Sequence, residues 1–181
     1  MKKIILIPLL LIMMASTEVF AQIGVRAGAN VANFDGYDFN SRIGLHLGAY
    51  YQWDYNDLFS VEPGLFFSQK GYKSSSDNIK ENLNYIDIPV LVRYWATRDL
   101  NIFAGPQGSV LVNRKYDNNG TISQTTEIVR GYDIAAVFGV GYEIFEDWNV
   151  QASYDLGLTS LNYFDVNVKN RVFKVSVGKR F

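Results

Sequence analysis

Every second residue after Ala21 belongs to an apolar row that continues through most of the chain. The row starts with Ile23 and Val25, whereas the residues between them, such as Gly24 and Arg26, are glycine or polar. Alternate side chains of a β-strand point to opposite faces of a sheet, so each row marks one face. The pattern predicts a sheet with one uncharged, apolar face and one polar face.

Eight segments carry this alternation. Short connections of three or four residues alternate with connections of seven residues or more that are rich in Asn, Asp and Ser. Short turns at one end and long loops at the other are typical of outer-membrane barrels. We therefore expect an all-β fold, an eight-stranded antiparallel up-and-down transmembrane β-barrel, with strands near 22–34, 42–53, 59–71, 84–96, 101–113, 130–144, 149–160 and 171–181.

The first 21 residues differ from the rest and resemble a secretory signal. Lys2 and Lys3 precede a run of 12 apolar residues, and Val19-Phe20-Ala21 fits a cleavage site. The run is too short for a membrane-spanning helix, which needs about 20 residues. We expect a cleaved signal peptide at 1–21 and one outer-membrane barrel domain at 22–181.

The glycines indicate which face points inward. Of the 15 glycines, 11 fall on the polar row, where glycine would weaken a solvated strand without packing against anything. The interior of an eight-stranded barrel has room only for side chains, so small residues must lie beside large ones. The polar row is therefore predicted to line the lumen. The alternative is a soluble, secreted, lipocalin-like barrel, in which the apolar row would face inward and bind an apolar ligand and the polar row would face water.

The charged residues of the polar row are nearly balanced in sign. Buried charges must be paired and hydrogen-bonded, so we predict a network that plugs the lumen rather than an open channel. The predicted lumen network comprises Arg26, Glu62, Asp87, Arg93, Asp133, Glu143, Asp155, Lys174 and Arg180.

Aromatic residues concentrate beside the short turns. Tyrosine and tryptophan rings collect at membrane–water interfaces, and all three tryptophans lie at this end. We predict an aromatic girdle of Tyr51, Trp53, Phe59, Tyr94, Trp95, Phe145 and Trp148, although the position of Trp95 has the parity of the lumen row. A second girdle at the long-loop end would include Tyr72 and Tyr116.

Several motifs together resemble the outer-membrane β-barrel domain family that includes PorT-like proteins. They include Glu62-Pro-Gly-Leu-Phe-Phe, Tyr85-Ile-Asp-Ile-Pro-Val and Ala104-Gly-Pro-Gln, and they continue to Gly178-Lys-Arg-Phe181. The resemblance implies a barrel of OmpX-like or OmpA-like architecture and provides no catalytic residues to transfer. PorT is linked to secretion, but family membership alone does not confer that role. The prolines in these motifs remove ladder hydrogen bonds, so bulges or local breaks are expected there.

Phe181, at the end of an alternating strand, resembles the signal read by the barrel-assembly machinery. Lys179 occupies a position where an aromatic residue is common, so this match is partial. The expected partners are thus outer-membrane lipid, the assembly machinery during biogenesis, and a protein that contacts the long loops. The expected location is the outer membrane of a Gram-negative bacterium.

Other chemistry has little support in the sequence. A net charge of -1 without a basic stripe argues against nucleic acid, and the absence of cysteine removes thiolate chemistry. We expect no catalytic residue, cofactor or metal site, and a non-enzymatic protein. An outer-membrane lipid-modifying enzyme remains an alternative, since such barrels use His with Ser and an acid; His46 is the single histidine here.

Overall fold

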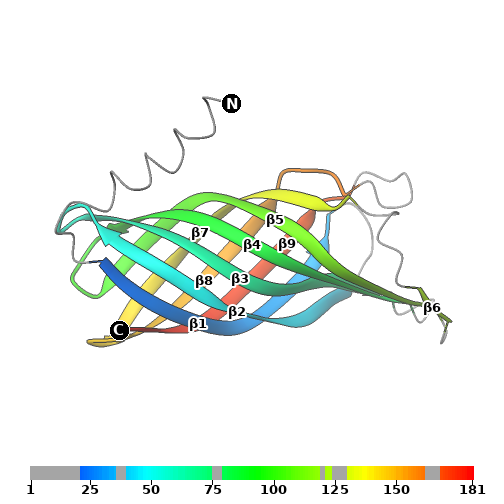
Figure 1. Ribbon diagram of the computed structural model, residues 1–181, viewed down its shortest axis with the longest axis horizontal. Helices are drawn as coiled ribbons and strands as arrows, with labels where there is room; N and C mark the ends of the chain where they lie inside the picture. The colour runs from blue at the N-terminus through cyan, green and yellow to red at the C-terminus, as the bar shows by residue number, and fades with distance from the viewer. Residues whose placement is uncertain (1–20, 36–39, 75–78, 119–120, 124–129, 162–167) are drawn as a thin grey trace, which may run out of the picture.

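Eight long antiparallel strands close into a barrel, as Figure 1 shows. The computed structural model describes residues 21–35, 40–74, 79–118, 121–123, 130–161 and 168–181. The predicted signal peptide therefore lies, except for Ala21, outside the described residues. The barrel strands are β1 (Ala21–Phe34), β2 (Asn40–Asp54), β3 (Phe59–Ser74), β4 (Ile79–Trp95), β5 (Leu100–Asn118), β7 (Tyr132–Phe145), β8 (Trp148–Gly157) and β9 (Asn170–Arg180).

Every barrel strand is hydrogen-bonded to a neighbour on both sides. β1 pairs with β2 and β9, and the pairing of β4 with β5 completes the ring. The short β6 (Thr121–Ser123) pairs with the end of β5. A closed ladder has no free edge, which is the condition for strands to cross a bilayer. This confirms the predicted eight-stranded barrel.

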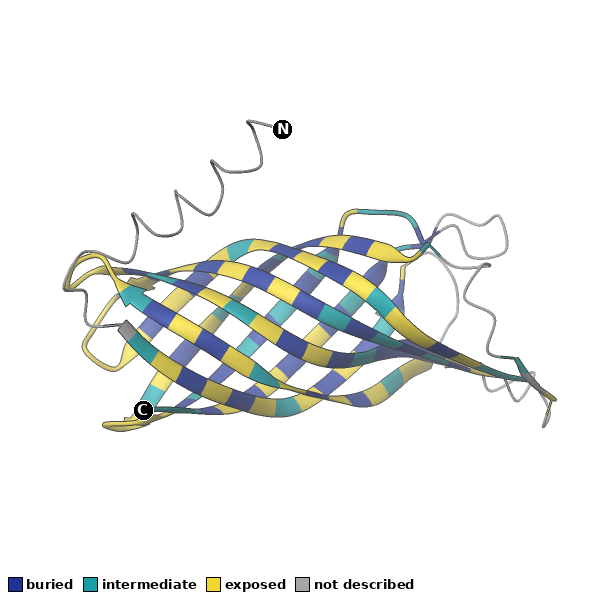
Figure 2. Ribbon diagram, viewed as in Figure 1, coloured by how far each residue is buried: buried dark blue, intermediate teal, exposed yellow. Residues whose placement is uncertain are grey.

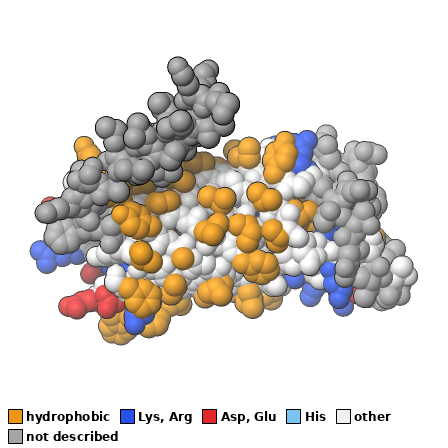
Figure 3. All heavy atoms as spheres, in the orientation of Figure 1, with side chains coloured by type: hydrophobic (Ala, Val, Ile, Leu, Met, Phe, Trp, Pro, Cys, Tyr) orange, Lys and Arg blue, Asp and Glu red, His pale blue; other side chains and the backbone are white. Residues whose placement is uncertain are grey.

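Burial alternates along each strand, so the barrel wall carries a checkerboard of buried and exposed residues (Figure 2). Ile43 and Leu47 are 73% and 61% exposed, whereas Arg26 and Asp87 are 2% and 0% exposed. Hydrophobic side chains consequently cover the middle of the outer surface (Figure 3). The apolar row faces outward and the polar row lines the lumen, as predicted. Among the described residues, no helix is long and apolar enough to span a membrane.

Three strands continue farther into the long-loop end than the alternation predicts. β3 ends at Ser74, β4 begins at Ile79 and β5 ends at Asn118, so residues expected in loops 72–83 and 114–129 belong to strands. Their inward side chains, among them Leu83 and Arg114, are completely buried. The strands continue past their predicted ends because their inward side chains still pack against one another there.

Pro63, Pro89 and Pro106 interrupt the ladder without shifting it. The pairing of β2 with β3 passes from Tyr50–Gly64 to Trp53–Val61, which leaves Pro63 unpaired on that side, and the register is the same before and after. Equivalent gaps lie opposite Pro89 in the β3–β4 ladder and opposite Pro106 in the β4–β5 ladder. The expected local breaks are present, whereas the register shifts occur elsewhere, for example between Asn84 and Tyr85.

Glycines on the inner face make room for large lumen side chains. A Cβ atom at Gly48 would lie 2.6 Å from the Phe66 ring and 2.1 Å from the Leu65 carbonyl oxygen. At Gly108, on the outer face, a Cβ atom would meet nothing within 4 Å. Inner and outer glycines are therefore under different steric constraints.

Gly48→Ala should destabilise the barrel by about 1–3 kcal/mol, because the added methyl group must displace backbone as well as a ring. Gly108→Ala serves as the matched control and should change stability by less than about 0.5 kcal/mol. The stability of both variants is measured by denaturant unfolding of the refolded barrels, with the heat-dependent gel shift as the readout of the folded fraction. Equal stability of the two variants would contradict the inward packing of Gly48.

Candidate functional site

The lumen holds six cationic and six anionic side chains in the described part of the chain. Most are almost completely buried, and the most exposed pair lies at the short-turn mouth. Opposite charges are equal in number in this set, and Arg42, half-buried at the long-loop mouth with its Nη1 on the Lys70 carbonyl oxygen, is a further cation with inward parity. The twelve are Arg26, Lys70, Arg93, Arg114, Lys174 and Arg180, with Glu62, Glu81, Asp87, Asp133, Glu143 and Asp155.

Glu62 is the centre of the first charge cluster. Arg26 Nη1 donates to Glu62 Oε1 over 2.7 Å, and Arg93 Nε donates to Glu62 Oε2 over 2.9 Å. Both guanidinium groups also make a second bond to this carboxylate, so each contact is bidentate. Arg93 further donates to Asn101 and Gln151 over 2.7 Å each. One carboxylate therefore links β1, β3 and β4, and amide oxygens accept further hydrogen bonds from Arg93, whereas Arg26 Nε is buried without a hydrogen-bond partner among the described residues.

A second cluster surrounds Asp87, farther toward the long loops. Lys70 Nζ lies 2.9 Å from Asp87 Oδ1, and Lys174 Nζ lies 3.1 Å from Asp87 Oδ2. Lys174 also contacts Asp155 Oδ2 at 2.7 Å, and Gln107 donates to the same oxygen. The four charges alternate in sign from β3 through β4 and β9 to β8. This alternation joins strands on different sides of the lumen.

Separate pairs occupy the two ends of the lumen. Arg180 Nη2 donates to Glu143 Oε2 over 2.8 Å at the short-turn mouth. Arg114 Nε donates to Glu81 Oε1 over 2.7 Å near the long loops, and neither side chain is exposed. The predicted network is therefore a series of separate clusters. Asp133 forms no ion pair with a described residue and instead accepts a hydrogen bond of 2.7 Å from Asn170.

An apolar core closes the long-loop end of the barrel. Tyr72 is among its members and is 4% exposed, so it does not contribute to an outer girdle. Leu161 and Val168 flank an undescribed stretch of the last long connection, and they are 0% and 1% exposed. The connection thus returns two apolar side chains into the mouth. The core consists of Phe34, Tyr72, Leu83, Tyr85, Leu161 and Val168.

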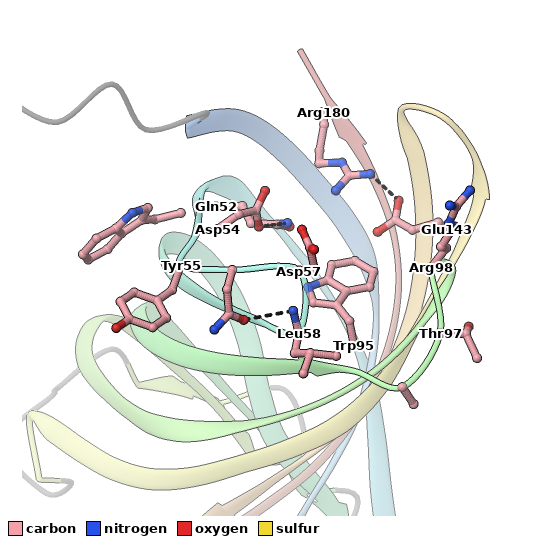
Figure 4. Close-up of a pocket in the computed structure, with 13 residues that line it drawn as sticks. Gln52, Asp54, Tyr55, Asp57, Leu58, Trp95, Thr97, Arg98, Glu143 and Arg180 are labelled. Carbon is pink, nitrogen blue, oxygen red and sulfur yellow. Dashed lines mark hydrogen bonds and ion pairs between the residues drawn. The ribbon is translucent and has the colours of Figure 1, made fainter.

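The short-turn end opens into a vestibule of about 1050 Å³ (Figure 4). Glu143 and Arg180 lie on one side, and Gln52 Nε2 donates to Asp54 Oδ1 over 2.8 Å on the other. Trp95 lines the vestibule and donates its indole N–H to Ser60 Oγ over 3.0 Å. The prediction that Trp95 belongs to the outer girdle is wrong, because its inward parity and this hydrogen bond hold the ring at the lumen mouth.

His46 joins a buried chain of three polar side chains. Its Nδ1 lies 2.5 Å from Asn30 Oδ1, and its Nε2 lies 2.8 Å from Ser176 Oγ. The Asn30 amide nitrogen has three oxygens within hydrogen-bond distance for its two hydrogens, including Ser68 Oγ, so the Oδ1 atom faces His46 and accepts from it. Nδ1 therefore carries the proton, and Nε2 accepts from the Ser176 hydroxyl. This is the order of nucleophile, base and orienting group found in hydrolases.

The surroundings of Ser176 leave no space for a substrate. Ser176 is 2% exposed and borders a cavity of about 30 Å³ together with His46, Phe66 and Lys174. Such a cavity holds about one or two water molecules. Along the barrel axis, the cavity beside Ser176 lies between the Glu62 cluster and the Asp87 cluster.

Most of the predicted girdle residues lie on the outer surface. Phe59 and Tyr94 are 42% and 40% exposed, and their ring centroids lie 5.3 Å apart. Lys179 Nζ lies 5.5 Å from the centroid of the Trp148 ring and 5.3 Å from that of Phe181. Tyr51, Phe145 and Trp148 are also exposed, whereas Trp53 is half-buried at the vestibule rim.

Sequence reasoning missed the Glu81–Arg114 pair and the partners of His46. Glu81 and Arg114 were assigned to loops, although the inward parity of Leu83 and Tyr85 extends to Glu81 and could have indicated a longer β4. Arg114 lies beyond a register shift that reverses the parity of β5, so alternation gives no such signal for it. The hydrogen bonds of His46 depend on which strands face each other across the lumen. That information is not contained in alternation within one strand.

Comparisons with known proteins identify the family. The model of the outer membrane protein beta-barrel domain matches residues 16–163. The chain belongs to this family. It is an outer-membrane β-barrel protein, so the soluble, lipocalin-like alternative is not supported. No curated protein matches the sequence at a significant level.

Solved structures show the same fold at low sequence identity. Neisserial surface protein A shares 15% identity with a TM-score of 0.61, over 89% of this chain and 97% of that one. Ail of Yersinia pestis, solved with the heparin analogue sucrose octasulfate, shares 17% identity with a TM-score of 0.56, over 91% and 100%. A major outer membrane protein of Thermus thermophilus shares 14% identity with a TM-score of 0.55, over 90% and 100%.

Glu62→Gln should destabilise this barrel by about 3–5 kcal/mol, because it leaves two buried guanidinium groups without their counter-ion. Asp35→Asn is the matched control: Asp35 pairs with Arg171 near the surface, and loss of such an exposed pair costs about 0–1 kcal/mol. Denaturant unfolding in detergent measures both variants. A Glu62→Gln barrel as stable as Asp35→Asn would show that the cluster does not stabilise the fold.

Proposed function

We propose that the protein is a sealed, non-enzymatic outer-membrane barrel that acts through its long-loop end. The main support is the successive closure of the lumen by the Glu62 cluster, the Asp87 cluster and the apolar core around Tyr72 and Leu161. Eight strands leave space only for side chains, and here those side chains are bonded to one another. A lumen without a path has no transport role, so function belongs to the ends.

We place the short turns in the periplasm and the long loops outside the cell. In this orientation the vestibule opens to the periplasm, and the strand extensions of β3, β4 and β5 stand above the apolar layer of the membrane on the outer side. The alternating connection lengths and the family support this arrangement. A structural role, or contact with a protein partner through the loops, fits such a barrel.

Biogenesis completes the proposal. We infer that residues 1–21 are removed as a signal peptide and that Phe181, exposed on the outer surface, is read by the barrel-assembly machinery. The mass of the outer-membrane form tests the first inference, and retention of a full-length chain would contradict it. Defective membrane assembly of Phe181→Ala tests the second.

Single cysteines test the orientation, because the natural chain contains none. Thr121→Cys lies on β6 at the long-loop end, and Asp147→Cys lies on a short turn; both positions are exposed. A membrane-impermeant maleimide added to intact cells should label Thr121→Cys and leave Asp147→Cys unlabelled until the outer membrane is opened. The reverse labelling would invert the proposed orientation.

The sealed interior predicts that Ser176 does not react in the folded barrel. A fluorophosphonate probe should label neither the wild type nor Ser176→Ala, and neither should release fatty acid from phospholipid vesicles. In planar bilayers the wild type should give no single-channel current. Labelling that depends on both Ser176 and His46 would instead establish a hydrolase, and steady current would establish a pore.

A further inference from the structure

The strand extension at the long-loop end carries lysines on its outward face. β3, β4 and β5 continue beyond the apolar band, whose last exposed residues there include Phe67 and Val112. Beyond it the outward positions change to amides and then to Lys73, Lys80 and Lys115, which are exposed. Lys and Arg side chains are visible at this end of the molecule in Figure 3. We call these three residues the lysine face.

The lysine face places like charges next to each other. Lys73 on β3 lies directly opposite Lys80 on β4 in the antiparallel ladder. Opposed side chains in such a ladder are about 5 Å apart at Cβ, and like charges at this spacing are destabilising. None of the three lysines forms an ion pair with a described residue. Asp117, opposite Lys80, is the acidic residue among the described residues of this face, and these residues together carry an excess of two positive charges.

The position of the face along the barrel axis indicates what it meets. Lys115 is three residues beyond Val112, and Lys73 is six residues beyond Phe67. With a rise of about 3.3 Å per residue and a tilt of about 40°, these lysines lie roughly 8 Å and roughly 15 Å above the apolar band. The headgroup region of an ordinary bilayer adds about 5–8 Å on each side, so Lys115 would lie at its outer limit. Lys73 would lie at a height that only a larger headgroup, such as a saccharide, reaches.

The residues between the band and the lysines have matching chemistry. Gln69, Asn84, Asn82 and Asn113 occupy the intervening outward positions, and their amides both donate and accept hydrogen bonds. Amides suit the hydroxyl groups of a saccharide, and lysine ammonium groups suit phosphate. Moving away from the apolar band, the outward surface of these strands therefore presents amide side chains first and lysine side chains next. This surface is continuous with the lipid-facing surface of the barrel.

We propose that the lysine face binds the phosphorylated saccharide headgroup of the glycolipid in the outer leaflet. The phosphate groups would lie between Lys73, Lys80 and Lys115, and they would relieve the repulsion of the opposed pair. The sugar would contact the amides below. This proposal rests on the proposed orientation, with the long loops outside, and adds a lipid ligand that fixes the height of the barrel in the membrane.

Titration of the folded barrel with rough lipopolysaccharide tests the proposal. The barrel is held in zwitterionic detergent, and bound lipid is counted by native mass spectrometry. The wild type should bind the phosphorylated lipid, and chemical removal of the phosphates should abolish the binding. The variant with Lys73→Gln, Lys80→Gln and Lys115→Gln should bind roughly 100-fold more weakly, since each lysine near a membrane surface contributes about one factor of five.

Two further variants keep the result interpretable. Arg98→Gln with Lys179→Gln removes cations from the short-turn end and should bind lipid like the wild type. Lys80→Gln alone removes the like-charge opposition and should weaken binding less than the triple variant. The heat-dependent gel shift checks that each barrel is folded, which we expect because all substituted lysines of the face are exposed.

Three results would overturn the proposal. The first is equal binding of phosphorylated and dephosphorylated lipid. The second is unchanged lipid binding by the triple variant. The third is a soluble heparin fragment that binds through the three lysines while lipid binding does not depend on them, which would assign the face to a soluble polyanion. Failure of the orientation itself is detected separately by surface labelling of Thr121→Cys, which does not depend on lipid binding.

Discussion

The narrowness of an eight-stranded lumen is the constraint on which the other features of this barrel depend. A charge inside it has no bulk water, so each must find an opposite charge or several hydrogen bonds. Glu62 meets this condition with two bidentate guanidinium contacts, and Asp87 meets it with two ammonium groups. Because the bonds connect strands that are not adjacent, such as β4 and β9, the interior stabilises the closed cross-section as well as neutralising charge.

Alternation predicted the fold because strand geometry converts sequence parity directly into a face. It therefore identified the lipid-facing row and nearly all of the lumen charges. Parity does not specify which lumen residues meet, since that depends on stagger and tilt around the barrel: Arg26 on β1 pairs with Glu62 on β3, two strands away. For Trp95, residue type suggested the membrane interface whereas parity indicated the lumen, and the structure follows parity.

The contacts of His46 show why hydrogen-bond geometry alone does not define a catalytic site. Ser176, His46 and Asn30 have the correct order, distances and tautomer for activating a hydroxyl group. The same distances also satisfy three buried polar groups that would otherwise be unpaired, which is sufficient reason for their arrangement. Catalysis additionally needs a volume for substrate beside the nucleophile. The adjoining cavity of about 30 Å³ does not supply it.

The two ends of the barrel are closed differently, and this difference supports the proposal that the protein acts through its long-loop end. At the short-turn end the charged residues pair along the wall and leave an open vestibule. At the long-loop end apolar side chains fill the mouth, and Glu81 with Arg114 is buried among the extended strands. Those extensions contribute nothing to crossing the apolar layer, since they lie beyond it. On the described part of this face, Lys73 and Lys80 lie directly opposite each other, and Asp117 is the acidic neighbour of Lys80. Under the proposal, a lipid phosphate would offset the positive charge that remains between the opposed lysines.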